Sequence, residues 1–226
     1  SDIAIGVSRL FGFDLMKNFA FPYFSRDIAE FWRRWHISLS TWFRDYLYIP
    51  LGGSKGSTIK KIRNVFIIFL VSGFWHGSNW TFVVWGGLNA LYFLPIMLRD
   101  KNRKHMEVVA SNTFLPTIKE SIQMFSTFLL TVFAWIFFRS DNIKSAIDYI
   151  SILCSKSFMS MPIIKSKSIL ALLLFFMAIE WLGRKNDFAL EQMTLKQPLR
   201  WLFYVLLIML IAIFEGKMQE FIYFQF

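Results

Sequence analysis

The sequence is poor in charged residues and in cysteine. Only 18% of its 226 residues are charged, and Cys154 is the single cysteine. Ordinary globular domains are about 25% charged, and a secreted domain stapled by disulfides needs paired cysteines. The hydrophobic content is also too high for intrinsic disorder, and the composition is not that of a coiled coil. These shortages exclude several classes of soluble protein.

Hydrophobic and aromatic side chains are abundant instead. They make up 55% and 19% of the chain, with 27 Phe and 9 Trp. They form long apolar blocks separated by basic patches, a pattern typical of a polytopic membrane protein.

The formal net charge of +10 comes from basic residues that flank the apolar blocks. Basic residues in these places anchor loops at the anionic cytoplasmic leaflet. We therefore expect the lipid bilayer, and not nucleic acid, to be the partner of this charge. The residues concerned are Lys55, Lys60, Lys61 and Arg63 before one block, and Arg99, Lys101, Arg103 and Lys104 after it.

The first residues carry neither an initiator methionine nor the charged start of a signal peptide. We expect the chain to be a fragment that has lost its beginning. Residues 1–24 are expected to be the end of a membrane or interfacial segment.

One amphipathic helix is predicted after residue 26. Asp27 and Glu30 have the spacing of an N-cap residue and an N3 carboxylate. Phe31, Trp35 and Leu39 then recur at intervals of one helical turn, while arginines occupy other positions. Such a helix is too polar to span the bilayer and is suited to its interface.

Residues 65–98 are expected to form two helices. As one helix they would extend about 51 Å, well beyond a hydrocarbon core of about 30 Å. Small and polar residues gather in the middle, over 72–80. We predict helices at 65–75 and 80–98, each short for a full crossing, with the break at membrane depth, where it must be buried in protein or line a cavity.

Three simpler spans are predicted at 121–138, 168–183 and 199–214. The expected fold is therefore all-α: a polytopic membrane helical bundle with short broken or re-entrant helices and an interfacial amphipathic helix.

His76 is the sharpest candidate for chemistry, because it lies at the predicted break. An ionisable residue at membrane depth is costly and indicates function, and a histidine can accept a proton near neutral pH. The alternative is a buried histidine hydrogen-bonded across helices. Ser72 lies one turn earlier, but the break is expected between the two.

The other histidines are weaker candidates on spacing alone. His36 adjoins two arginines and is typical of a packed or solvated interfacial residue, and His105 is interpreted as a surface loop residue.

Other site patterns are missing from the sequence. It has no Gly-x-Ser-x-Gly, His-Glu-x-x-His or Cys-x-x-Cys motif, no paired carboxylates, and only three widely spaced histidines. We expect neither a metal nor a bound cofactor. The glycine-rich loop 51–57 lacks P-loop spacing and is interpreted as a flexible basic loop.

Several long motifs carry a family resemblance. The run 31–53 (FWRRWHISLSTWFRDYLYIPLGG), the Gly-Phe-Trp-His-Gly of 73–77 with Trp80, the Phe-Arg-Ser of 138–140 and the closing 221–226 resemble the membrane-bound O-acyltransferase family. The similarity is to its bacterial branch, which acts in alginate O-acetylation and on peptidoglycan or teichoic acid. Residues 1–226 would be the C-terminal portion of one such membrane domain, with the N-terminal helices missing.

The resemblance implies that His76 is the catalytic histidine and His36 the second characteristic one. It implies transfer of an acyl group, in this branch acetyl, from a cytoplasmic thioester such as acetyl-CoA toward hydroxyls of an exported polysaccharide. His76 would be the base, and His36 would orient the acceptor or assist a second proton transfer. Trp75 and Trp80 would pack the walls, and the basic loop 52–63 would attract the donor.

The resemblance also implies a multi-pass protein of the bacterial cytoplasmic membrane that works with a periplasmic or membrane-anchored acetyltransferase. Two alternatives stay open. One is a relative that transfers D-alanine to teichoic acid. The other is a non-enzymatic transporter or scaffold subunit, because broken helices also form midplane binding sites.

Overall fold

The computed structural model describes residues 1–155 and 167–214, which are helical and contain no strand. This agrees with the expected all-α class. In chain order the elements are α1 (Asp2–Leu10), the 3-10 turn η1 (Pro22–Phe24), α2 (Ile28–Arg34), α3 (Ile37–Phe43), the π-helical turn η2 (Arg44–Tyr48), α4 (Thr58–Trp75), α5 (Trp80–Leu98), α6 (Ile118–Arg139), α7 (Ile143–Leu153), α8 (Lys167–Gly183) and α9 (Gln197–Ile213).

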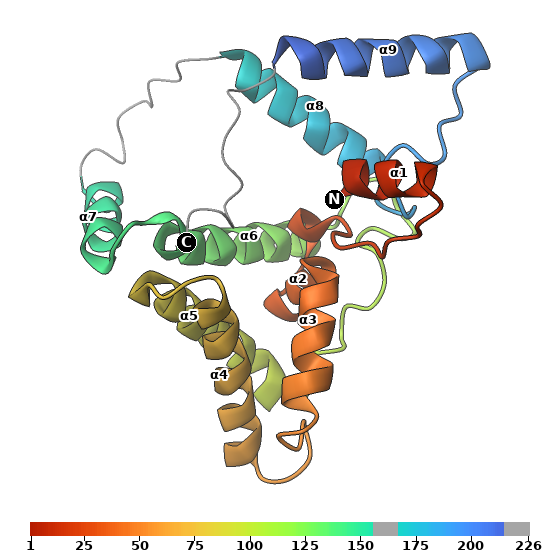
Figure 1. The fold of residues 1–226 in the computed structure, drawn as a ribbon. Coiled ribbons are helices and arrows are strands. Elements are labelled where there is room, and N and C mark those ends of the chain that lie inside the picture. Colours follow the sequence, from red (N-terminus) through yellow and green to blue (C-terminus); the bar gives the residue numbers. More distant parts are fainter. Residues whose placement is uncertain (156–166, 215–226) are drawn as a thin grey trace.

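Helices α4 and α5 form a hairpin at one end of the molecule, and α8 and α9 lie at the other (Figure 1). Between them, α6 runs across the top of the hairpin, and α2 and α3 lie beside it (Figure 1). The expected C-terminal motif at 221–226 lies outside the described residues.

The start of α2 is as predicted, but the amphipathic helix after it is not continuous. The Asp27 carboxylate accepts a hydrogen bond from the Glu30 backbone N–H at 2.7 Å, as an N-cap does. The chain leaves the helix at Trp35, which is extended, and His36 has a left-handed backbone with φ 44°. The helix is therefore divided into α2 and α3, and the first turn of α2 is buried all round, so the prediction of one continuous helix is wrong.

The α4–α5 hairpin confirms the predicted pair of helices, with α5 at its predicted bounds, but corrects the start of α4. Helix α4 begins at Thr58, well before the predicted 65, and has 18 residues. Helix α5 has 19 residues and is long and apolar enough to cross a membrane, so it is not short for a crossing. The basic loop predicted at 52–63 is helical from Thr58 onward. Its first part is fastened by Asn64, whose side-chain N–H groups donate to Leu51 O and Gly53 O at 3.1 and 3.0 Å.

Two glycines let the backbones of α4 and α5 touch. A Cβ added at Gly73 would overlap the carbonyl oxygen of Phe82, and one at Gly86 would overlap that of Phe69. Small residues at a helix interface allow such close approach in membranes, where packing, and not the hydrophobic effect, drives helix association. These two contacts set the distance between α5 and α4, the helix that ends at His76.

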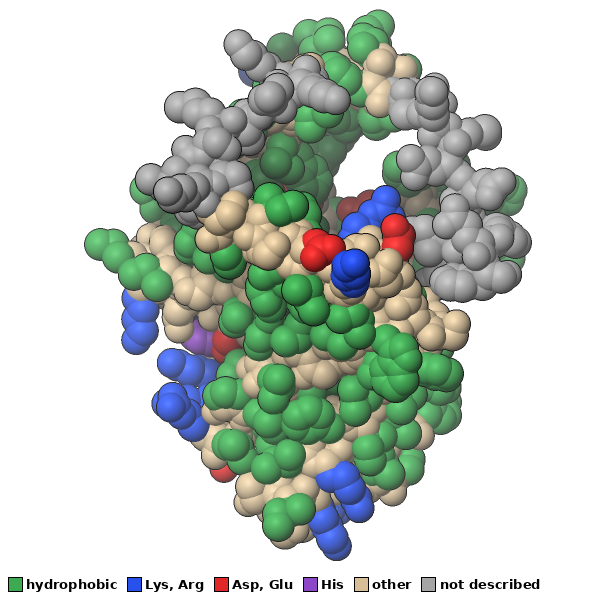
Figure 2. Space-filling model, turned by 90° about the vertical axis from the view of Figure 1, so that its left-hand side faces the viewer, with side chains coloured by type: hydrophobic (Ala, Val, Ile, Leu, Met, Phe, Trp, Pro, Cys, Tyr) green, Lys and Arg blue, Asp and Glu red, His purple; other side chains and the backbone are tan. Residues whose placement is uncertain are grey.

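The outer surface supports the membrane assignment. Among the described helices, α5 and α6 are long and apolar enough to span a membrane. Only 33% of the most apolar stretch of α5 and 22% of that of α6 is buried inside the protein. The core helix of a soluble protein would be mostly buried, whereas these expose their side chains. Figure 2 shows hydrophobic side chains over much of one face, with Lys and Arg in a few groups.

The other predicted spans are helical, with one difference. Helix α6 covers the predicted 121–138, and α8 and α9 agree with the predicted 168–183 and 199–214 to within two residues at each end. The segment between α6 and α8 contains α7, a helix that was not expected there. Residues 156–166 of that segment lie outside the described part of the chain.

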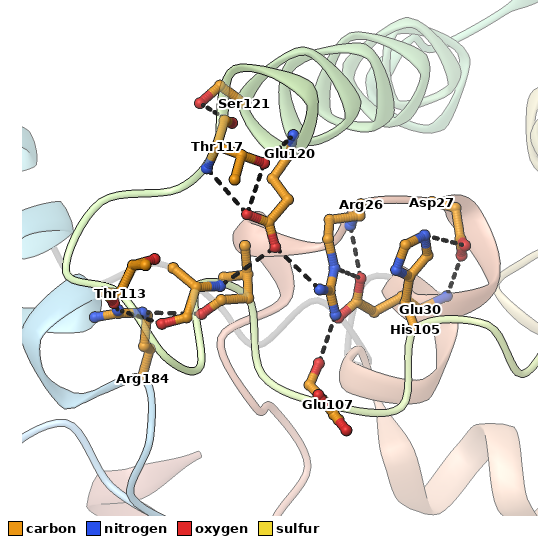
Figure 3. A network of polar contacts seen from close by, with 12 residues as sticks. Arg26, Asp27, Glu30, His105, Glu107, Thr113, Thr117, Glu120, Ser121 and Arg184 are labelled. Atoms are coloured by element: carbon orange, nitrogen blue, oxygen red, sulfur yellow. Dashed lines mark hydrogen bonds and ion pairs between the residues drawn. The ribbon is translucent and has the colours of Figure 1, made fainter.

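A buried carboxylate joins α2 to the rest of the molecule. Glu30, with 1% of its side chain exposed, accepts from Arg26 at 3.1 Å and from Arg34 at 2.8 Å. Arg26 also contacts Glu120 of α6 at 3.3 Å (Figure 3). A buried charge is tolerated only when it is paired and hydrogen-bonded, as Glu30 is.

The long connection between α5 and α6 is bound to α2 by polar contacts. His105, which was interpreted as a surface loop residue, takes part in these contacts and is partly buried. The His105 carbonyl accepts from Arg33 at 2.7 Å, and its Nε2 lies 3.7 Å from the Asp27 carboxylate. Burial and the nearby Arg26 lower the pKa of His105, against the pull of Asp27. At the far end, Arg184 donates to the carbonyls of Val109 and Ala110 at 3.2 Å each.

Replacement of Gly73 by alanine is expected to separate α4 from α5. The added methyl has no space against the Phe82 carbonyl, and overpacking of this kind costs about 1–3 kcal/mol. Thermal unfolding of the detergent-solubilised protein measures the loss. Gly87→Ala is the matched control, because its Cβ would meet only Leu70 Cδ2 at 3.8 Å. Equal midpoints for the two variants would contradict the close contact.

Replacement of Glu30 by glutamine is expected to destabilise the protein strongly. It leaves the Arg34 guanidinium without its counter-charge and Arg26 with Glu120 alone, and breaking a buried pair costs about 3–5 kcal/mol. Chemical or thermal unfolding in detergent reports the change. Glu107→Gln removes an exposed carboxylate from the same region, so it should leave the midpoint where it was.

Candidate active site

A cavity of about 1080 Å³ lies between the hairpin, α2, α3 and α6. Ligand sites commonly occupy about 300–1,000 Å³, so this one can hold a sizeable molecule. His36 and His76 both line it. Two residues forty positions apart, chosen from sequence, are thus brought to one cavity. Its walls also include Phe19, Tyr23, Trp32, Trp35, Ser40, Phe43, Arg44, Ser54, Lys61, Val65, Phe69, Ser72, Trp85, Asp100, Arg103, Trp135, Phe138 and Arg139.

One face of α4 forms the long side of the cavity. Lys61, Val65, Phe69, Ser72 and His76 follow each other at intervals of three or four residues, and all of them line it. From Lys61 to His76 this face is about 22 Å long at 1.5 Å per residue. The cavity is therefore an elongated passage with a basic residue at one end of α4 and the histidine at the other.

His76 sits at the C-terminal end of α4 inside a set of aromatic rings. Its imidazole packs edge-on against Phe138 at 4.9 Å and Trp85 at 5.4 Å between ring centroids. The helix continues through Ser72 and ends only at Trp75, with the His76 N–H bonded to Gly73 O at 3.0 Å. The helix therefore ends between Ser72 and His76, but only at the last residue before His76, and both residues line the cavity.

His36 is held in a backbone conformation that most residues avoid. A non-glycine residue in the left-handed region costs on the order of 1–3 kcal/mol and persists only where its surroundings hold it. Here residues 18–20 hold the backbone in place, with one hydrogen bond before His36 and one after it. Ala20 N–H bonds to Arg34 O at 2.9 Å, and Ile37 N–H bonds to Asn18 O at 3.0 Å.

The His36 side chain has an unused hydrogen-bonding atom. Its Nδ1 is buried, and no described residue provides a partner for it. Burial lowers the pKa of His36, so its imidazole stays neutral at pH 7. The ring lines the cavity, and a neutral imidazole in such a position can bind or orient a hydroxyl group.

Cations surround the openings of the cavity. Arg44, Arg103 and Arg139 are exposed and yet line it, which places them at its rim, and Lys61 joins them from α4. Asp100 is the one carboxylate among the lining residues in the described part of the chain. This charge favours an anionic ligand.

The aromatic walls are not those expected from sequence. Trp75 and Trp80 are 46% and 71% exposed and are not among the lining residues, so the prediction that they pack the walls is wrong. Trp32, Trp35, Trp85 and Trp135 take that place. Trp32 and Trp35 belong to the 31–53 motif, but nothing in the spacing indicated that Trp85 and Trp135 would join them.

Within residues 1–155 and 167–214, no group of three His, Cys, Asp or Glu side chains could hold a metal ion. The chemistry available to the cavity from these residues is that of two imidazoles, hydroxyls and cations.

Comparison with known proteins gives consistent matches. The membrane-bound O-acyltransferase family model matches residues 1–138. Over 146 residues the chain is 43% identical to a probable alginate O-acetylase of Pseudomonas aeruginosa, a match that covers 65% of this chain and 26% of that protein. It is 39% identical to a peptidoglycan O-acetyltransferase of Helicobacter pylori over 146 residues, with 65% and 26% covered.

A teichoic acid D-alanyltransferase of Bacillus subtilis is 34% identical over 116 residues, which cover 48% of this chain and 29% of that protein. The chain thus spans about a quarter of the length of the curated relatives it matches. The part that matches the family model includes α1 to α5 and both cavity histidines. Because this match extends over more than half of the chain, the protein is a membrane protein and belongs to the membrane-bound O-acyltransferase family.

Proposed function

We propose that the protein transfers an acetyl group from a cytoplasmic thioester toward hydroxyls of an exported cell-envelope polysaccharide. The observation that carries this proposal is the joint position of His36 and His76 on one elongated cavity with a cationic rim. The relatives described as alginate and peptidoglycan O-acetyltransferases support the acyl group and the class of acceptor.

The donor enters from the basic end of the passage. Lys61 and Arg103 attract the phosphates of a donor such as acetyl-CoA, and the thioester lies along the α4 face toward His76. The distance of about 22 Å along α4 suits an extended donor whose charged end stays at the rim.

His76 acts as the general base. It takes the proton of the attacking hydroxyl, whose oxygen forms a bond to the thioester carbonyl carbon. The C–S bond then breaks, and the proton returns from the imidazolium to the thiolate, so an ester and a free thiol leave. A positioned base of this kind contributes about 10²–10⁴ in rate.

His36 orients the acceptor. Its imidazole lines the cavity together with that of His76, and its left-handed backbone is held from both sides by the segment before α2. A rigidly held polar group of this type lowers the entropy lost when two reactants meet.

The proposal also includes the location of the whole protein, as a multi-pass protein of the bacterial cytoplasmic membrane. A periplasmic or membrane-anchored acetyltransferase is its proposed partner, which receives the acetyl group and passes it to the polysaccharide. Donor and acceptor then approach the cavity from opposite sides of the membrane.

A second candidate is transfer of D-alanine from a carrier-protein thioester to teichoic acid. The match to a teichoic acid D-alanyltransferase favours it. The cavity and the two histidines would serve either donor, because both reactions move an acyl group from a thioester to a hydroxyl.

Replacement of His76 by alanine is expected to abolish ester-linked acetate on exported polysaccharide, since it removes the base. The loss should be about 10²–10⁴-fold at matched membrane abundance. His105→Ala is the control, because His105 lies outside the cavity lining. Acetate that persists in His76→Ala would favour a structural histidine and the transporter or scaffold alternative.

The donor can be identified with membranes that contain the protein. Labelled acetyl-CoA is expected to give labelled ester in wild type and none in His76→Ala, whereas a D-alanyl carrier thioester should give none in either. Esterification from the carrier thioester alone would reverse the order of the two candidates. Lys61→Ala should raise the KM for acetyl-CoA without an equal loss of kcat, because it removes only an attraction at the rim.

A further inference from the structure

Asn89 is a buried amide within the apolar helix α5. Asn89 is 2% exposed, and both polar atoms of its side chain form hydrogen bonds. The Nδ2 donates to Trp85 O, one turn earlier, at 2.8 Å, and the Oδ1 accepts from Trp32 Nε1 of α2 at 3.3 Å. A polar group at this depth is expensive unless it is satisfied, and an apolar residue would serve α5 at lower cost.

The two residues that Asn89 binds form part of the cavity wall. The rings of Trp32 and Trp85 lie 5.7 Å apart at 74°, and both line the cavity, whereas Asn89 stands behind them. Trp85 is 4% exposed, and its ring meets the His76 imidazole at 88°. A row of contacts therefore leads from Asn89 through Trp85 to His76.

We propose that Asn89 is a positioning residue for His76, acting through the Trp32 and Trp85 rings; this rests on the proposed acyltransferase function. The indole N–H of Trp32 can only donate. With its acceptor removed, it must turn to find another partner, and its ring then no longer supports Trp85. His76 loses the wall that fixes the direction of its imidazole, and a small misplacement of a catalytic group is costly in rate.

The test compares three variants of the full-length protein in membranes: Asn89→Leu, which removes the acceptor, Trp32→Phe, which removes the donor but keeps a ring, and the double variant. Each single change should lower kcat for acetyl transfer about tenfold, with the KM for acetyl-CoA unchanged. The double variant should lose no more than either single one, because both break the same bond.

Trp181→Phe is the matched control. It removes an indole donor that bonds to Phe114 O at 3.1 Å, away from the cavity lining, so its kcat should equal that of wild type. Activities are divided by the amount of folded protein, measured by size-exclusion chromatography and thermal unfolding.

The outcomes are distinct. Additive losses, a rise in KM in place of a fall in kcat, or wild-type kcat per folded molecule would overturn the role of Asn89. If Asn89→Leu does not fold, Trp32→Phe alone decides, and wild-type kcat in that variant rejects the proposal. Absence of acetyl transfer by wild type, or full activity in His76→Ala, would overturn the proposed function first and this inference with it.

Discussion

The contact between the backbones of α4 and α5 determines the shape of the candidate site. At Gly73 and Gly86 the helices touch without side chains between them, and farther along the hairpin their side chains pack in one cluster around Val65 and Ala90. The face of α4 from Lys61 to His76 forms a wall of the cavity. The spacing of three and four residues brings the histidine, a hydroxyl and a cation into line on this face, and the close contact with α5 fixes where the face lies. Wider spacing would move this wall relative to α2 and α6.

The opposite wall depends on charge and on backbone hydrogen bonds. Glu30 fixes α2 through two buried guanidiniums, and the extended segment at 18–20 holds both ends of the kink at His36. The strained backbone of His36 persists because the residues on either side of it, Arg34 and Ile37, are held by these hydrogen bonds. The His36 ring lines the cavity, while its Nδ1 is buried and has no hydrogen-bond partner among the described residues.

The helices could be predicted from sequence because their signals are local. The N-cap residue Asp27 predicts the start of α2, and the apolar runs predict the positions of α5, α6, α8 and α9. The kink at His36 was missed, because the apolar spacing continues through it and the bonds that impose it come from residues 18–20. The same applies to Trp85, whose ring neighbours Trp32 and Phe138 are distant in the sequence. Of the site, His76 could be predicted from the helix break and from its motif, His36 from its motif alone, and Lys61 as part of the basic stretch 52–63.

Buried polar groups in this protein have two different consequences. Thr131 of α6 returns its hydroxyl to Thr127 O at 2.9 Å, one turn earlier in the same helix. Such a bond satisfies the hydroxyl but leaves the helix free to rotate against its neighbours. Asn89 also bonds within its own helix through Nδ2, but its Oδ1 accepts a hydrogen bond from Trp32 of α2. In an apolar solvent, where side chains of neighbouring helices gain little from burial alone, a bond of the second kind adds to close packing in fixing one helix against another. A cavity built from several separate helices gains most from such a bond close to its reacting group, and the Asn89–Trp32 bond lies one ring away from His76.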